Sequence, residues 1–183
     1  MMLIIGLGNP GTQYENSRHN FGFRVLDLLA GGQEWENKYD SLFIKTDDVI
    51  LAKPQLYMNL SGKAVAQILK FYPAPDVIEE IIVIHDDLDL PLGSLKIQKN
   101  ASGAGHNGVQ SVIDEIGTND FIRIRLGIDN PETRAEIPGD QFVLQKFTSL
   151  ENKIVKEVLE KAKGAIDVLQ TQGLNIAQSK FNG

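Results

Sequence analysis

Residues 81–87 read IIVIHDD, so a run of aliphatic side chains leads directly into three polar ones. A short continuous aliphatic run is typical of a strand that is buried on both faces of a parallel sheet. His85, Asp86 and Asp87 would then lie at the carboxyl end of that strand, where functional groups of open α/β sheets collect. The stretch therefore predicts both a central strand and the location of a site.

Strand-like and helix-like segments alternate on both sides of this stretch. Residues 2–7 form another aliphatic run, which leads into the turn sequence GNPG at residues 8–11. Further strands are predicted at residues 42–44, 49–52, 94–98 and 121–128, with a short one around Val143. Helices are predicted at residues 21–30, 62–72, 109–116 and 150–170, where apolar side chains recur at helical spacing. This alternation predicts an α/β layer fold.

The chain has the size of one domain, because 183 residues bury one sizeable core and no repeat or linker divides them. We therefore expect a single domain over residues 1–183, with a disordered tail at residues 179–183. No window of about 18 apolar residues is present, and the apolar run 3–7 lacks the basic flank of a signal peptide. These features predict a cytoplasmic protein without a membrane segment.

Composition limits the chemistry. The sequence has no cysteine, which excludes disulfides and thiolate metal ligands within it. Its formal net charge of -6 argues against a large sequence-independent nucleic-acid binder, whose affinity comes from neutralising many phosphates. Any contact with a nucleic acid must therefore be local.

Residues 6–11 read GLGNPG and match the dinucleotide-binding pattern GxGxxG. Pro10, however, lacks a backbone N–H where that pattern directs N–H groups at a pyrophosphate. No strand ending in an acidic ribose ligand follows about 20 residues later, because Asp27 lies inside a predicted helix. A nucleotide-dependent oxidoreductase is therefore disfavoured, and the pattern fits a tight turn or another kind of active-site loop.

His19 and Asp86 form a candidate pair. An imidazole with an ordinary pKa near 6.5 suits general-base work, although a lone histidine before a helix also fits a capping role. A carboxylate at a strand end would hold His19 in one tautomer and stabilise its imidazolium. Residues 86–89, DDLD, also offer hard oxygen ligands, but their spacing matches no calcium loop, and His85 and His106 do not form a zinc pair.

Two further segments are ambiguous by themselves. Residues 57–62 read YMNLSG, where Ser61 suits a helix N-cap and Asn59 a turn. Ser61 is not in a GxSxG nucleophile elbow, which disfavours an acyl-enzyme. Residues 105–108 read GHNG, which fits either helix-entry glycines with a capping Asn107 or amide donors that face a developing oxyanion.

Taken in order, these segments resemble bacterial-type peptidyl-tRNA hydrolases: GLGNPG (6–11), Tyr14, RHN (18–20), YMNLSG (57–62), DDLDLP (86–91) and GHNG (105–108). The resemblance implies a single α/β domain with a twisted mixed sheet flanked by helices. It also implies a monomer that needs no metal or cofactor. The expected reaction is hydrolysis of the ester between peptide and tRNA, which recycles tRNA from prematurely released peptidyl-tRNA.

The resemblance also assigns roles to residues. His19 is the expected base that activates water, and Asp86 orients it. The expected substrate-binding residues are Asn9, Tyr14, Asn20, Met58, Asn59 and Asn107. Of these, Asn9, Asn59 and Asn107 are expected to position the substrate and stabilise the transition state.

Basic residues near the site are expected to bind tRNA phosphate, and Lys96 and Arg125 match such positions, with Lys146 a weaker candidate. Gln98 stands where some relatives have a basic residue, which leaves open whether Lys99 compensates. Ala104 stands where many relatives have glycine, which leaves the loop conformation open.

A non-enzymatic RNA-binding module is the alternative, because the same scaffold resembles a chloroplast intron-splicing factor. The presence of His19, Asp86, Asn9, Asn59 and Asn107, together with the acidic net charge, argues against it.

Overall fold

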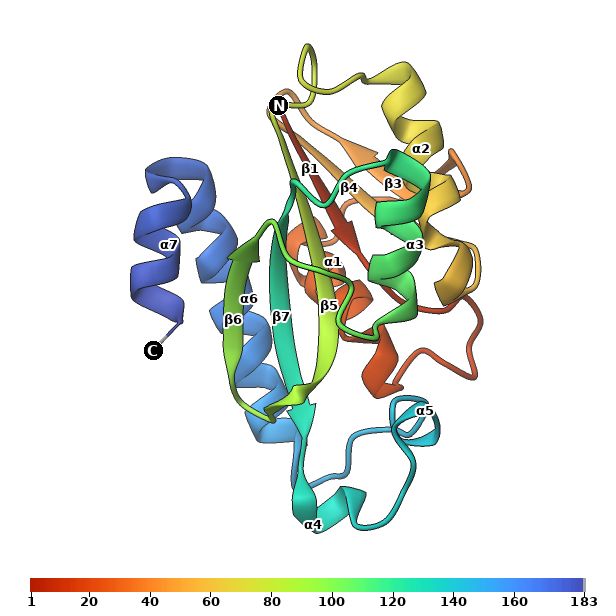
Figure 1. Cartoon of the computed structure of the whole chain (residues 1–183), viewed down its shortest axis with the longest axis vertical. Helices are drawn as coiled ribbons and strands as arrows, with labels where there is room; N and C mark the ends of the chain where they lie inside the picture. The colour runs from red at the N-terminus through yellow and green to blue at the C-terminus, as the bar shows by residue number, and fades with distance from the viewer. Residues whose placement is uncertain (183) are drawn as a thin grey trace.

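The computed structural model describes residues 1–182 and contains one seven-stranded sheet with the order β2-β3-β4-β1-β5-β7-β6 (Figure 1). Its strands are β1 (Met2–Gly6), β2 (Glu36–Lys38), β3 (Ser41–Lys45), β4 (Val49–Pro54), β5 (Glu80–Pro91), β6 (Leu95–Lys99) and β7 (Ile122–Asp129). The central strands β4, β1, β5 and β7 are parallel, while β2, β3 and β6 join the two edges in antiparallel pairs. The sheet is therefore mixed, as expected.

Helices cover both faces of the sheet. They are α1 (Phe21–Ala30), α2 (Ser61–Phe71), α3 (Asn107–Ile116), α4 (Pro131–Arg134), α5 (Gly139–Phe142), α6 (Asn152–Gln172) and α7 (Leu174–Phe181), with the 3-10 turns η1 (Arg18–Asn20) and η2 (Met58–Leu60). In Figure 1, α2 and α3 lie on one face, and α1 and α6 lie on the other. No described helix combines the length and the apolarity that a membrane crossing requires.

The aliphatic run of β5 is explained by this sandwich. Ile82 and Ile84 pack into the core under α1 and α6, whereas Ile81 and Val83 pack into the core under α2 and α3. Each fully buried aliphatic side chain contributes about 1.5–3 kcal/mol relative to an exposed one. A strand between two helical layers therefore needs apolar residues at every position, not at alternate positions.

The predicted strands and helices are confirmed with small shifts at their ends, apart from two differences near the site. First, β5 does not end before His85 but continues to Pro91, because β7 pairs with it through Asp87 and again at Pro91 after a register shift. Second, Val143 is not in a strand. Its N–H donates to the carbonyl of Gly139 at 3.1 Å, so it closes the helical turn α5.

The tail is the largest difference. Residues 179–182 were predicted to be disordered, but α7 continues to Phe181. The side chain of Asn182 then accepts a hydrogen bond from the N–H of Ile97 at 2.6 Å and donates one to its carbonyl at 2.9 Å. Buried Ala177 also fixes α7 to the core. Gly183 lies outside the described residues.

Close helix packing brings the predicted site together. A Cβ on Gly22 would lie 2.4 Å from the carbonyl oxygen of Ile84 and 2.5 Å from the nitrogen of Leu7. Only glycine therefore allows the start of α1 to approach β1 and β5 this closely. The preceding turn η1, which carries His19, consequently lies against β5 at Asp86.

Candidate active site

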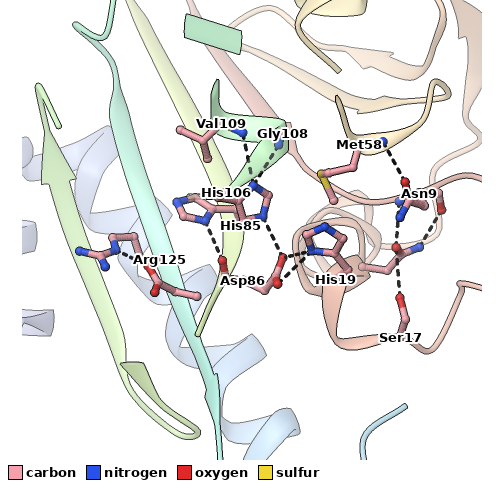
Figure 2. Close-up of polar contacts among 12 residues, drawn as sticks. Asn9, Ser17, His19, Met58, His85, Asp86, His106, Gly108, Val109 and Arg125 are labelled. Atoms are coloured by element: carbon pink, nitrogen blue, oxygen red, sulfur yellow. Dashed lines mark hydrogen bonds and ion pairs between the residues drawn. The ribbon is translucent and has the colours of Figure 1, made fainter. Parts of the chain in front are cut away.

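His19 and Asp86 form a buried hydrogen-bonded pair. The Nδ1 atom of His19 lies 2.9 Å and 3.0 Å from the two carboxylate oxygens of Asp86 (Figure 2). Asp86 is 1% exposed and His19 is 9% exposed. A carboxylate accepts only, so a neutral His19 carries its proton on Nδ1. Its Nε2 atom has no hydrogen-bond partner among the described residues and keeps a free lone pair, as a general base requires.

A second imidazole shares Asp86. The Nε2 atom of His106 lies 3.1 Å from the same Asp86 oxygen that contacts His19. His106 is also the N-cap of α3, and its Nδ1 atom accepts hydrogen bonds from the backbone N–H groups of Gly108 and Val109. Nδ1 must therefore be unprotonated, which fixes His106 as a neutral donor to Asp86 through Nε2–H.

The electrostatics of the pair favour proton transfer to His19. Burial by itself would lower the pKa of His19, but the charge of Asp86 and its hydrogen bond outweigh burial and raise the pKa above the ordinary 6.5. Burial would raise the pKa of Asp86, but attraction to His19 and the hydrogen bonds from His106 and His19 lower it far below its ordinary range. Asp86 is therefore ionised whenever His19 titrates.

His85 faces the same region without joining this pair. Its Nδ1–H donates to the backbone carbonyl of Asp86 at 2.7 Å, and its ring lies 4.7 Å from that of His106 in an edge-on arrangement. Burial lowers the pKa of His85 well below 6.5. His85 therefore stays neutral and contributes shape rather than charge.

On the other side of His19 lies Asn9 (Figure 2), which is held by hydrogen bonds with Asn20 and Met58. The backbone N–H of Asn9 donates to Asn20 Oδ1, and Asn20 Nδ2 donates to the Asn9 carbonyl, both at 2.9 Å. Asn9 Oδ1 in turn accepts the backbone N–H of Met58 at 2.8 Å. These contacts fix the orientation of the Asn9 side-chain amide. Its Nδ2 donor has no partner among the described residues.

A cavity of about 270 Å³ opens beside the pair. It is lined by His19, by residues 85–89 of β5, by residues 103–107 at the start of α3, and by Gly139, Asp140 and Val143. Of the predicted substrate-binding residues, only Asn107 lines this cavity, while Asn9, Asn20 and Met58 form the network on the far side of His19.

Two predicted residues are in neither group. Asn59 is exposed and Tyr14 is half-buried, and neither lines the cavity.

The predicted phosphate ligands are Lys96 and Arg125, which are cross-strand neighbours on β6 and β7. Arg125 is not free, because its guanidinium donates to Asp87 and to Gln98 Oε1. Its charge is therefore largely neutralised, whereas no salt bridge engages Lys96 among the described residues.

Lys99, which follows Gln98, already has acidic partners. Its Nζ atom bonds Glu80 at 3.0 Å and lies 3.5 Å from Asp120, so its charge is already paired. Ala104 adopts φ 48°, a left-handed conformation that costs a non-glycine residue about 1–2 kcal/mol. The loop therefore keeps the conformation that glycine would adopt, at the expense of local strain.

The sequence patterns predicted the wrong N-cap residues for α2 and α3. Leu60, not Ser61, is the N-cap of α2, and Ser61 Oγ is buried without a hydrogen-bond partner in the described chain. A buried hydroxyl with no neighbouring base cannot serve as a nucleophile. Likewise the α3 cap is His106, not Asn107. The role of His106 was missed because a lone histidine gives no spacing signal, although its place before a helix was visible.

Three groups in the site have the types and spacing of metal ligands. The ligand atoms of His19, Asp86 and His106 all lie within 4.8 Å of one another. For His106 Nε2 to bind a cation, its proton would have to move to Nδ1, where it would face the N–H groups of Gly108 and Val109. That conflict makes the cluster fit a hydrogen-bonded relay better than a metal centre.

Known proteins resemble this chain in sequence and in fold. The family model described as peptidyl-tRNA hydrolase matches residues 3–183. Peptidyl-tRNA hydrolase of Clostridium botulinum (strain Alaska E43 / Type E3) is 40% identical over 190 residues, which cover 100% of this chain and 96% of that protein. The protein of the same name from Thermodesulfovibrio yellowstonii is 42% identical over 189 residues, with coverages of 100% and 99%.

A crystal structure of peptidyl-tRNA hydrolase from Acinetobacter baumannii superposes with a TM-score of 0.84 at 31% identity, covering 98% of this chain and 93% of that one. Sequence and fold therefore agree over nearly the whole length, and the chain belongs to the peptidyl-tRNA hydrolase family.

Proposed function

We propose that this chain hydrolyses the ester that joins the peptide to the tRNA in peptidyl-tRNA, with His19 as the base that activates water. The observation that carries the proposal is the pairing of His19 Nδ1 with both oxygens of Asp86, which leaves Nε2 available beside the cavity. Release of the peptide returns the tRNA to aminoacylation.

The reaction balances with one base. Water gives a proton to His19 Nε2 while its oxygen attacks the ester carbonyl, and the imidazolium is stabilised by the ionised Asp86. Collapse of the tetrahedral intermediate breaks the bond to the ribose oxygen, which takes the proton back from His19. The products are a peptide carboxylate, whose proton is released to solvent, and a free tRNA hydroxyl.

Amide donors stabilise the oxyanion in this proposal. Asn9 is the best candidate, because its oxygen is held by the Met58 N–H and its free Nδ2 donor therefore has a fixed direction. Asn107, which lines the cavity, is a second donor. An ester has a good leaving group, so oriented amides and one base suffice without a covalent nucleophile.

Selectivity for a peptidyl group follows from the same amides. A peptidyl ester carries a backbone amide next to the scissile carbonyl, while an aminoacyl ester carries a free amine there. Asparagine side chains both donate and accept hydrogen bonds, so they can pair with a peptide backbone and discriminate against the shorter ester. Exposed Asn59 and half-buried Tyr14 are the residues that we assign to the more distant part of the peptide.

Contact with tRNA is local in this proposal. The formal net charge of -6 repels a long polyanion, so a few groups near the cavity must hold the phosphates. Lys96 is assigned this role, and Arg125 contributes once a phosphate competes with Asp87 for its guanidinium. We further propose a cytoplasmic monomer that needs no metal, the latter because the tautomer of His106 opposes metal binding.

The test is release of labelled N-acetyl-aminoacyl groups from tRNA by the wild-type chain and by His19→Ala, with EDTA present. Uncapped aminoacyl-tRNA serves as the control substrate. The proposal expects cleavage of the capped substrate only, and loss of cleavage in the variant. If the wild-type chain binds tRNA but cleaves neither substrate, it is a non-enzymatic RNA-binding module instead.

A further inference from the structure

Arg18, the residue before His19, is a fully buried guanidinium that is 1% exposed. Its Nη2 atom donates to Glu151 Oε2 at 2.8 Å, and the two side chains are 133 residues apart in the sequence. The guanidinium carbon lies 4.2 Å from the ring centre of Phe142 and 4.7 Å from that of Phe147. A buried charge is costly unless it is paired and well packed. Here Nη2 is paired and the guanidinium packs on two aromatic rings, although Nε and Nη1 have no hydrogen-bond partner among the described residues.

Glu151 gathers further segments onto Arg18. Its Oε2 atom also accepts the backbone N–H of Thr148 at 2.7 Å, while Oε1 accepts Asn130 Nδ2 at 3.0 Å and Thr133 Oγ1 at 3.1 Å. Burial alone would raise the pKa of Glu151, but the hydrogen bonds from Arg18, Thr148 and Asn130 lower it to about 2. The carboxylate therefore joins the end of β7, the start of α4 and the start of α6 to the turn that carries His19.

The backbone of the same region holds His19 directly. The N–H of Arg18 donates to the carbonyl of Gln145 at 2.9 Å, and the N–H of His19 donates to the carbonyl of Val143 at 2.8 Å. Val143 and Gly139 are also part of the cavity wall. One short segment, residues 139–147, therefore provides both a wall of the cavity and the backbone anchors of His19.

The chain from residue 131 to residue 147 has little regular structure of its own to hold it. The helices α4 and α5 are four residues long each, which is too short for stable isolated helices. Their position depends on tertiary contacts, and the ion pair at Arg18 is one of the buried contacts that tie them to η1.

We infer that Arg18 and Glu151 are a positioning pair that keeps His19 aligned with Asp86 and holds the wall of residues 139–147 closed over the cavity. The inference rests on the proposed hydrolysis for its kinetic consequence, but the alignment itself can be observed without turnover. Neither residue touches the substrate, and both act through His19 and the cavity wall.

The first variant is Glu151→Gln, which keeps the shape of the side chain and removes its charge. We expect kcat to fall about 10- to 100-fold, because a displacement of about 1 Å in a catalytic group has effects of that size. The pKa of His19 should fall toward or below 6.5, because looser contact with Asp86 leaves the effect of burial less opposed. NMR titration of the imidazoles reports this pKa whether or not the protein turns over.

Asp27→Asn is the matched control. Asp27 bonds Lys53, another buried cation, whose Nζ atom lies 4.3 Å from the ring centre of Trp35. The control also changes a carboxylate to an amide beside a buried cation with an aromatic neighbour. It should lower stability while leaving kcat and the pKa of His19 unchanged.

A second variant is needed in case Glu151→Gln folds poorly, because that change leaves Arg18 without its ion partner. In Arg18→Met/Glu151→Met both charges are removed, so a folded protein is expected with the same losses in kcat and in the pKa of His19. Hydrogen exchange should be faster at residues 131–147 than in the control.

The inference is overturned if either folded variant keeps the wild-type kcat and the wild-type pKa of His19. An inactive wild-type chain would remove the proposed function instead, and in that case a lowered pKa in the variants would still support the positioning role.

Discussion

Replacing Asp86 by asparagine should disable His19 through its tautomer. One carboxylate oxygen contacts both His19 and His106, while the other contacts His19 alone. His106 can only donate to this group, because its Nδ1 atom already accepts from α3. In Asp86→Asn the oxygen must therefore stay with His106, and the amide nitrogen takes the position 3.0 Å from His19 Nδ1. His19 then accepts at Nδ1 and carries its proton on Nε2, where the base needs a lone pair.

The expected loss is large. The same replacement in a serine-protease triad lowers kcat about 10⁴-fold by enforcing the wrong tautomer. Here the shared oxygen still lies 2.9 Å from His19 Nδ1, so part of the population keeps the active tautomer. We expect a loss of about 10³- to 10⁴-fold, or about 4–5.5 kcal/mol in the barrier. Asp86→Ala should lower turnover less than His19→Ala, because a correctly protonated but poorly oriented base still activates water.

A second change should restore part of the loss. In Asp86→Asn/His106→Ala the amide is free to turn its oxygen toward His19, so the double variant should be at least about 10-fold faster than Asp86→Asn alone, a positive coupling energy. Single-turnover release of N-acetyl-aminoacyl groups from tRNA measures the chemical step. The tautomer argument fails if Asp86→Asn stays within about 10-fold of wild type, or if the double variant is no faster than the single one.

Three further outcomes are expected. The value of kcat/KM should fall as pH drops through the pKa of His19, which lies above 6.5, so a profile that is flat from about pH 5 to 8 would contradict the base assignment. Glu151 has a folded pKa of about 2 against an ordinary 4.5, so it contributes about 3 kcal/mol that is fully present above pH 4.5 and is lost as pH falls toward 2. Urea unfolding at pH 7 and pH 3 should therefore show a smaller loss for Glu151→Gln than for wild type. Asn9→Ala should lower kcat about 10²- to 10³-fold with little change in KM, whereas a raised KM at constant kcat would assign Asn9 to substrate binding alone.

The central part of the fold was predictable because its signals are local. The aliphatic run before His85 indicates a strand that is covered on both faces. In the structure, helices cover both faces of β5, so every position of this run is apolar. The pairing of His19 with Asp86 needed chemical reasoning as well, since 67 residues separate them.

What escaped prediction depends on partners that are distant in the sequence. His106 is recognisable as part of the site only when Asp86 is seen beside it. No role was predicted for Arg18, because its partner Glu151 lies in a distant segment of the sequence. The three-residue strand β2 was missed because its side chains are all exposed and polar, so no apolar alternation marks it.

The last turn of the chain also bears on how the molecule avoids self-association. β6 is an edge strand, and free N–H and C=O groups on such an edge are a template for strands of other molecules. Asn182 satisfies both groups of Ile97, and Gln178 donates a further hydrogen bond to the same carbonyl. The side-chain amide of Asn182 thus makes the two hydrogen bonds that the backbone of a neighbouring strand would make with Ile97. Deleting Asn182 would remove two of these hydrogen bonds, leave the N–H of Ile97 free for pairing with other molecules and favour aggregation.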